Sequence, residues 1–204
     1  MIAKIYLFVW QGIHPTKVVA EAAVDVDFIV SSLPRTSDVE KVLTMKGGVF
    51  ENASPDTMIL DTSTISPIAS KELAKTAKSH NVIFIDSPMS GGIMGAANGT
   101  LTFMVGAPDN DDFKRASIVL KGMGKNIFPC GGPGTGQIAK IANNMILGIN
   151  MVAACEGMAM GEKLGIDPKV LCDILSVCTA NSWVIDTTNP RPGNKPNAPA
   201  SNNY

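Results

Sequence analysis

Short apolar runs alternate with helical patterns over about the first 134 residues, and this alternation restricts the fold more than any other feature of the sequence. The apolar runs, each of strand length, are Ile5–Trp10, Phe28–Leu33, Thr57–Asp61, Asn81–Asp86, Leu101–Val105 and Asn126–Cys130. Helical patterns separate many of them, at Thr16–Ala23, Ser37–Leu43, Pro67–Lys78 and Asp111–Leu120. Strands that alternate with helices are typical of an α/β fold with a doubly wound, mostly parallel sheet.

The alternation stops near Gly134, and only helical patterns follow it as far as Cys178. A long helix is predicted over Gln137–Leu164, and a Gly165-Ile-Asp167 break separates it from a second helix over Pro168–Cys178. We therefore expect a sheet domain over residues 1–134 and a helical domain over residues 135–204. The tail from Thr187 to Tyr204 is rich in Pro and Asn and predicts a loop.

The charge and the cysteine content exclude several classes of function. The net charge is −1, without any basic or acidic block, which argues against nucleic acid as a partner and against an electrostatic membrane anchor. The four cysteines form no C-x-x-C pair, and His14 and His80 are far apart in the sequence. We therefore expect no metal site and no disulfide framework, and instead reduced, mostly buried thiols.

The long predicted helix is apolar enough to raise the question of a membrane span. Asn150, Glu156 and several glycines interrupt its apolar sequence. A buried central helix therefore fits the pattern better than a span, and we expect no membrane association.

The segment from Gly134 to Asn144 combines a glycine turn with a helix that carries two polar side chains on one face. Lys140 and Asn144 are about one helical turn apart, so their side chains point the same way. A lysine accepts the proton of an alcohol when burial lowers its pKa toward neutrality; the alternative is a lysine that snorkels to solvent. Asn144 is a candidate to bind a carboxylate or a hydroxyl group, or else a buried amide that holds a neighbouring loop.

A second glycine-rich segment, Ser90-Gly91-Gly92, follows the predicted strand that ends at Asp86. Two successive glycines allow backbone N–H groups to approach a carboxylate closely and to form an anion-binding nest. Ser90 adds a hydroxyl donor. The alternative interpretation is an ordinary tight turn.

Two other strands end at Leu33-Pro34 and at Asp61-Thr-Ser-Thr64, which should share one edge of the sheet. Ligands of open α/β sheets lie at the carboxyl ends of the strands. Thr64 is therefore a candidate for a cofactor contact, although it could instead cap the following helix. That helix has Pro67 at its first position and Ser66 as a plausible N-cap.

The sequence lacks the G-x-G-x-x-G fingerprint with which a dinucleotide-binding half normally begins. The first apolar run continues into Gln11-Gly-Ile-His14 instead. The glycine cluster at residues 131–136 leads into the helical part of the chain and does not replace the fingerprint.

These segments, together with several others in the same order, resemble the β-hydroxyacid dehydrogenase family, in particular its 3-hydroxyisobutyrate branch. The resemblance covers roughly residues 14 to 204. The matching segments are Leu33-Pro34, Asp61–Pro67, Asp86–Gly92, Gly99–Gly106, Gly134–Asn144, Leu164–Pro168, Trp183 with Asp186–Pro190, and Ala200–Tyr204.

The resemblance implies an incomplete Rossmann-type domain followed by part of an all-helical domain. It implies an NAD-dependent oxidoreductase that interconverts 3-hydroxyisobutyrate and methylmalonate semialdehyde in valine (branched-chain amino acid) catabolism. Such an enzyme would be a homo-oligomer in its full-length form, in the mitochondrial matrix of a eukaryote and otherwise in the cytoplasm. The implied roles are catalytic acid/base for Lys140, substrate binding for Ser90, Gly91, Gly92 and Asn144, and NAD binding for Leu33, Pro34 and Thr64.

The chain departs from the family pattern at both ends and at Asp38, where relatives often have an asparagine near the cofactor. The glycine fingerprint is missing, and so is a later Lys-Asp-Leu segment whose lysine contacts the cofactor. We therefore expect a chain that is truncated at both ends, binds NAD poorly and self-associates. Two alternatives remain open: a non-catalytic binding or assembly module that kept the fold, and a relative that acts on another short semialdehyde.

Overall fold

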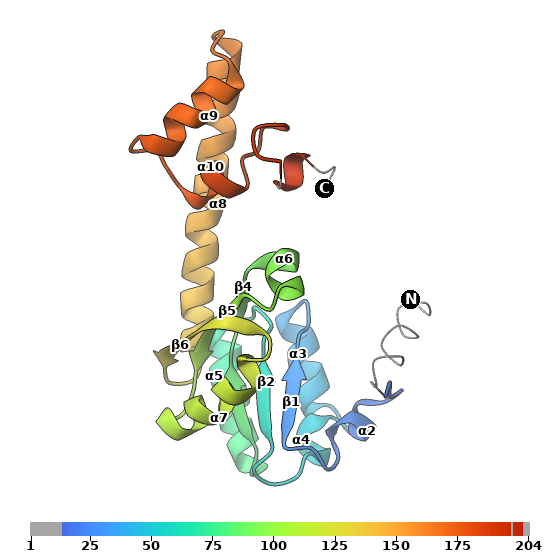
Figure 1. The fold of residues 1–204 in the computed structure, drawn as a ribbon. Coiled ribbons are helices and arrows are strands. Elements are labelled where there is room, and N and C mark those ends of the chain that lie inside the picture. Colours follow the sequence, from blue (N-terminus) through green and yellow to red (C-terminus); the bar gives the residue numbers. More distant parts are fainter. Residues whose placement is uncertain (1–13, 197, 202–204) are drawn as a thin grey trace. The chain divides into compact units, whose positions relative to one another are not determined.

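A computed structural model describes residues 14–196 and 198–201, and the predicted strand Ile5–Trp10 lies outside these residues. The chain forms two compact units, which meet in the sequence between Ile141 and Ala142. Figure 1 shows the elements of each unit, and we describe the two units separately. The boundary predicted between residues 134 and 135 remains a prediction.

Unit 1 contains a mixed, mostly parallel sheet of six strands in the described residues, in the order β1-β2-β3-β5-β4 with β6 beside β5. The strands are β1 (Phe28–Ser31), β2 (Met58–Asp61), β3 (Ile83–Asp86), β4 (Met89–Ser90), β5 (Leu101–Gly106) and β6 (Gly124–Gly131). β1, β2 and β3 are parallel, as are β5 and β6, whereas β5 runs antiparallel to β3 and β4. The predicted fold class is therefore confirmed.

Helices cover both faces of this sheet (Figure 1). The helices of unit 1 are α2 (Val19–Ala23), α3 (Thr36–Thr44), α4 (Val49–Asn52), α5 (Pro67–Ser79), α6 (Gly92–Ala97) and α7 (Asn110–Leu120). Alternate residues of β2 point to opposite faces: Ile59 packs with the cluster under α3 and α5, and Leu60 packs with the cluster under α7. This alternation gives unit 1 two separate apolar cores.

The register between β3 and β5 determines what lies beyond the carboxyl ends of the parallel strands. These two strands pair only at Asp86 and Gly106. Because β5 is antiparallel and ends there, its earlier residues extend past the ends of β1–β3. β4 pairs with this extension at Ser90 and Thr102, and α6 follows it (Figure 1). Ser90 and the two glycines after it therefore lie on the carboxyl side of the sheet.

Unit 2 is helical. Its elements are the greater part of α8 (Thr135–Lys163), α9 (Pro168–Val177), α10 (Trp183–Thr187) and the short η1 (Pro199–Ser201). Ala154 on α8 packs against Val184 and Ile185 of α10. Asp167 caps α9 by accepting from the backbone N–H groups of Lys169 and Val170 at 2.9 and 3.0 Å. The uninterrupted α8 and the break before α9 agree with the sequence pattern.

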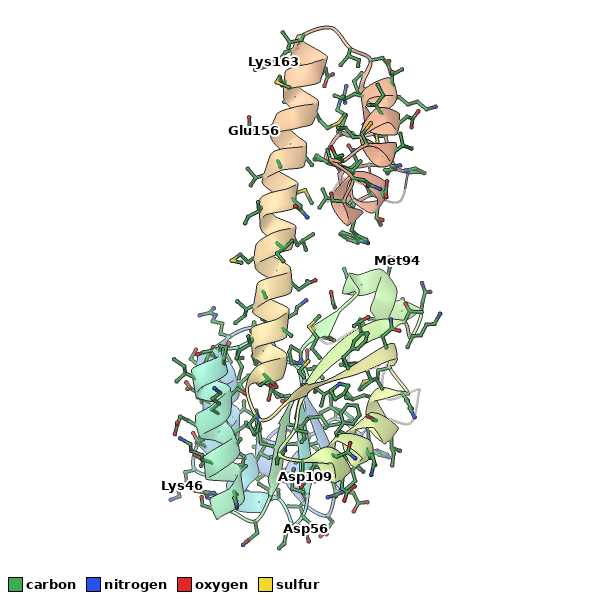
Figure 2. All side chains as sticks on the ribbon, turned by 90° about the vertical axis from the view of Figure 1, so that its left-hand side faces the viewer. Lys46, Asp56, Met94, Asp109, Glu156 and Lys163 are labelled. Atoms are coloured by element: carbon green, nitrogen blue, oxygen red, sulfur yellow. The ribbon has the colours of Figure 1, made fainter. Side chains whose placement is uncertain are left out.

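The prediction that α8 is buried is wrong for the described chain. Only 6% of its most apolar window is buried, and side chains such as Ile149, 62% exposed, face solvent. Figure 2 shows side chains projecting around α8 up to Glu156 and Lys163. By length and composition α8 would be able to cross a membrane, but the core helix of a soluble protein meets the same criteria. Helix burial depends on neighbouring surfaces, which a hydropathy pattern does not contain.

Other local predictions also need correction. Of the four cysteines, which are all free, only Cys172 is buried, whereas Cys155 and Cys178 are exposed. The predicted C-terminal loop contains η1. The elements without a sequence signal were α4, β4, α6, α10 and η1, which are too short to show a helical or strand period.

Candidate active site at the carboxyl edge of the sheet

The ends of β1 and β2 are joined by a buried network around Asp61. Its Oδ1 accepts from the hydroxyl groups of Ser31 and Ser63 at 2.8 and 2.6 Å. The Ser63 hydroxyl oxygen in turn accepts from the backbone N–H of Leu33 at 2.8 Å. The segments after the two strands, with half-buried Leu33 and exposed Pro34 and Thr64, are therefore held at one edge.

Asp61 is fully buried, and burial raises its pKa above the usual range of an aspartate. The hydrogen bonds from Ser63 and Ser31 act in the opposite direction, because they stabilise the ionised form. Its Oδ2 has no hydrogen-bond partner in the described part of the chain. Ionising a buried carboxyl group with one unpaired oxygen costs free energy, so this environment disfavours the charged form of Asp61.

Thr64 does not cap α5. The cap is Ser66, whose hydroxyl accepts from the backbone N–H of Ala69 at 3.5 Å, with Pro67 at the first helical position. The Ser66 backbone N–H donates to Thr36 Oγ1 at 3.1 Å, which fixes this turn against α3. The capping alternative for Thr64 is therefore wrong, and the exposed threonine is available to a ligand.

Asp86 connects the end of β3 to the start of α8. Its two oxygens accept from the backbone N–H groups of Gly134 and Gln137 at 2.6 and 3.0 Å. Burial raises the pKa of Asp86 to about 6, although these backbone donors lower it. A carboxylate at a helix N-terminus pairs with N–H groups that have no partner within the helix. Asp86 therefore anchors α8 at the carboxyl edge.

Gln137 makes the second connection from α8 to this edge. Its fully buried side chain donates to the carbonyl oxygen of Ser63 at 2.9 Å and accepts from the N–H of Ile65 at 3.0 Å. Sequence reasoning assigned no role to Gln137 or to the carboxylate of Asp86. The available signals were a polar residue beside the glycine turn and an acid at the end of a buried strand.

Lys140 follows Gln137 by about one helical turn and is 9% exposed. Burial lowers the pKa of its amine from the usual value. In the described part of the chain it makes no ion pair that would oppose this effect. The snorkelling alternative is therefore wrong, and Lys140 has the environment of a lysine that gives up its proton more readily than usual.

Ser90, Gly91 and Gly92 form the end of β4 and the start of α6. Gly91 and Gly92 have φ values of 134° and 59°, which favour glycine. A Cβ on Gly91 would lie 3.1 Å from Leu101 Cδ2, whereas one on Gly92 would meet nothing within 4 Å. The conformation thus explains both glycines as turn residues, and the open space at Gly92 leaves its backbone accessible.

Asn144 lies on α8 within unit 2, and its side chain is exposed. Its Oδ1 accepts only a long hydrogen bond from Asn143 Nδ2, at 3.4 Å, among the described residues. The alternative of a buried amide that holds a loop is therefore wrong. The other candidate residues all belong to unit 1 and lie on the carboxyl side of its sheet.

A groove of about 670 Å³ in unit 1 lies elsewhere. It is bounded by α5, β3 and the start of α7, with Lys78, Phe84 and Asp112 among its lining residues. It contains none of the candidate residues, so we assign the chemistry by the carboxyl-edge geometry and not by this groove.

The chain matches the models of two known protein families, one over each part of the sequence. Residues 2–132 match the model described as the NAD binding domain of 6-phosphogluconate dehydrogenase. Residues 134–199 match the model described as NAD-binding of NADP-dependent 3-hydroxyisobutyrate dehydrogenase. NAD as the cofactor of the family is therefore confirmed.

Individual relatives agree with these matches. The probable mitochondrial 3-hydroxyisobutyrate dehydrogenase of Dictyostelium discoideum is 45% identical over 91% of this chain, which spans 57% of that relative. An NAD-dependent L-serine dehydrogenase of Pseudomonas aeruginosa is 36% identical over 95% of this chain and 64% of its own length. The solved structure of Mycobacterium tuberculosis 3-hydroxyisobutyrate dehydrogenase with L-serine superposes with a TM-score of 0.85 at 38% identity, over 93% of this chain and 64% of that one. The chain therefore belongs to the NAD-binding β-hydroxyacid dehydrogenase family, as a relative of its 3-hydroxyisobutyrate dehydrogenases.

Proposed function

We propose that this chain carries the acid/base part of an NAD-dependent dehydrogenase that interconverts 3-hydroxyisobutyrate and methylmalonate semialdehyde in valine catabolism. The observation that carries the proposal is the buried Lys140, whose pKa is lowered, on a helix anchored at the carboxyl edge of the sheet. The chain spans 57% of the first relative named above. The proposal therefore assigns to this chain an activity that is named for longer relatives.

A bound NAD would supply the hydride acceptor for the carbon that bears the substrate hydroxyl. Leu33, Pro34 and Thr64 fit the nicotinamide half of such a cofactor, because they lie at the joined ends of β1 and β2 and Pro34 and Thr64 are exposed. The G-x-G-x-x-G turn that would hold the pyrophosphate does not occur in the sequence.

Lys140 would take the hydroxyl proton during oxidation and return it during reduction. An amine whose pKa is lowered by burial is neutral in a larger fraction of molecules near neutral pH, as a general base must be. Ser90 and the backbone N–H groups of Gly91 and Gly92 would bind the substrate carboxylate, and Asn144 would orient the hydroxyl or the carboxylate.

The names of the relatives support a substrate class wider than one acid. L-Serine and 3-hydroxyisobutyrate are both 3-hydroxypropanoates, and they differ in the substituent at carbon 2, which is an amino group in serine and a methyl group in 3-hydroxyisobutyrate. L-Serine is therefore the second candidate substrate, favoured by the L-serine dehydrogenase relative and by the relative solved with L-serine. The ratio of kcat/KM for the two acids would decide between them.

A homo-oligomer without nucleic-acid or membrane partners is part of the proposal. So is the location, which would be mitochondrial in a eukaryote, as in the Dictyostelium relative, and otherwise cytoplasmic. The competing function is a binding module that kept the fold without catalysis, for which the missing glycine fingerprint argues.

Lys140→Ala tests the proposal. At millimolar NAD and hydroxy acid, we expect turnover to fall by about 10²–10⁴-fold, the usual contribution of a positioned acid/base. Lys121→Ala, which removes an exposed lysine of unit 1, is the matched control and should leave turnover unchanged. Near-normal turnover in Lys140→Ala would remove Lys140 from the mechanism, and no turnover by the unaltered chain would favour the binding module.

A further inference from the structure

The buried amide of Gln137 holds the loop that contains Thr64. One end of the amide, Nε2, donates to the carbonyl oxygen of Ser63, and the other end, Oε1, accepts from the N–H of Ile65. These two backbone groups flank Thr64 directly in the sequence. A single side chain therefore fixes the loop on both sides of the residue assigned to the cofactor.

The same residue is tied to the helix that carries Lys140. Gln137 precedes Lys140 by about one turn of α8, at a spacing that makes side chains neighbours on a helix face. Its own backbone N–H donates to Asp86 at 3.0 Å, so its position relative to the end of β3 is fixed as well. Gln137 thus joins three parts of unit 1: the end of β3, the Thr64 loop and the start of α8.

We propose that Gln137 is a positioning residue that holds the Thr64 loop and Lys140 in one geometry. The inference rests on the proposed function, which assigns the roles of those two residues. A primary amide supplies both a donor and an acceptor on one planar group, and the loop uses both. A side chain lacking either one leaves a buried backbone group unpaired, and the loop relieves that cost by moving.

The test uses the 204-residue chain and requires no turnover. Acetic anhydride reacts with neutral amines, so the pH dependence of Lys140 acetylation, followed by mass spectrometry, reports the apparent pKa of this amine. In Gln137→Met we expect the midpoint to rise by about one pH unit, or about tenfold in proton affinity, because a loosened loop admits water. Hydrogen exchange at the Ile65 amide should accelerate about tenfold or more.

Gln137→Glu separates hydrogen bonding from the filling of space. The ionised carboxylate accepts from Ile65 but has no proton for the Ser63 carbonyl, whereas the protonated form restores both bonds. We therefore expect protection of the Ile65 amide, relative to the unaltered chain at the same pH, to recover as the pH falls. This variant also keeps the test decisive if Gln137→Met does not fold.

Val82→Ala is the control for a general loss of stability, because it removes buried methyl groups from the core near α5 without touching the Gln137 bonds. We expect its Lys140 acetylation profile to match that of the unaltered chain. Unaltered profiles and Ile65 exchange in both Gln137 variants would overturn the inference, as would an equal shift in Val82→Ala. Failure of the proposed function would appear separately, as unchanged turnover in Lys140→Ala.

Discussion

Replacing Asp86 with asparagine tests whether burial or the helix N-terminus controls this carboxyl group. Asp86 is fully buried and accepts from the N–H groups of Gly134 and Gln137. Burial raises its pKa from 3.8 to about 6, against the opposing effect of these donors. Asparagine keeps the shape of the side chain but removes its titration, and its single oxygen leaves one of the two N–H groups without an acceptor.

The expected magnitude follows from linkage between protonation and folding. A carboxyl pKa that is higher in the folded protein than in the unfolded chain means that folding favours the protonated form. The stability from this group is complete below about pH 4 and is lost as the pH rises to about 6. The difference between 3.8 and about 6 corresponds to about 3 kcal/mol. The unpaired N–H in the variant adds a cost of about 1–3 kcal/mol that does not depend on pH.

Urea unfolding of both proteins, followed by circular dichroism from about pH 4 to about pH 7, measures this difference. The free energy of unfolding of the unaltered chain minus that of Asp86→Asn should decrease by up to about 3 kcal/mol over this range. A carbon-13 NMR titration of the Asp86 carboxyl group gives the pKa directly. If the free-energy difference instead grows with pH, the helix N-terminus outweighs burial and the reasoning is refuted.

The remaining predictions concern α8 and cofactor affinity. Gly136→Ala should lower thermal stability, because its Cβ would lie 2.8 Å from Asp86 Oδ2, whereas Gly148→Ala, with nothing within 4 Å, should raise stability by about 0.5–1 kcal/mol. Effects of equal sign would contradict this. Calorimetric titration should show weak NAD binding by the 204-residue chain, since no glycine fingerprint holds the pyrophosphate; a micromolar dissociation constant would show that the fingerprint is dispensable. Light scattering should show self-association at micromolar concentration, because burying exposed side chains such as Met145 and Ile149 gains about 25 cal/mol per Å². A stable monomer would count against it.

Local signals predicted the centre of unit 1 well because the strands β2 and β3 are short, mainly buried apolar runs. β2 and β3 lie within the predicted apolar segments, since both of their faces pack against helices. The N-cap of α5 could also be predicted, because proline favours the first helical position and Pro67 therefore makes the preceding Ser66 the expected cap. Thr64 remained ambiguous because threonine is itself a common cap.

The connections of the site could not be predicted because they join residues distant in sequence. The partners of the Gln137 amide, Ser63 and Ile65, precede it by 74 and 72 residues. The sequence around a glutamine in an apolar helix does not identify these hydrogen-bond partners. Lys140 differs, because its chemistry was inferred from its place on an apolar helix, and the structure supplies the burial on which that inference depended.

The residues at the carboxyl ends of the parallel strands contribute both to stability and to the geometry of the site. Ser31, Asp61, Asp86 and Gly106 are register partners in a row across β1, β2, β3 and β5. Two buried aspartates in such a row are unfavourable alone, and each is compensated by donors from a segment beyond the sheet. Asp61 takes donors from the loop of Thr64, and Asp86 takes them from the start of α8. Neutral replacements of these two aspartates would remove the cost of burying charge. They would also weaken the attachment of the Thr64 loop, which carries the proposed cofactor contact, and of the start of α8, which carries Lys140. Substitutions that stabilise this edge are therefore expected to loosen the site.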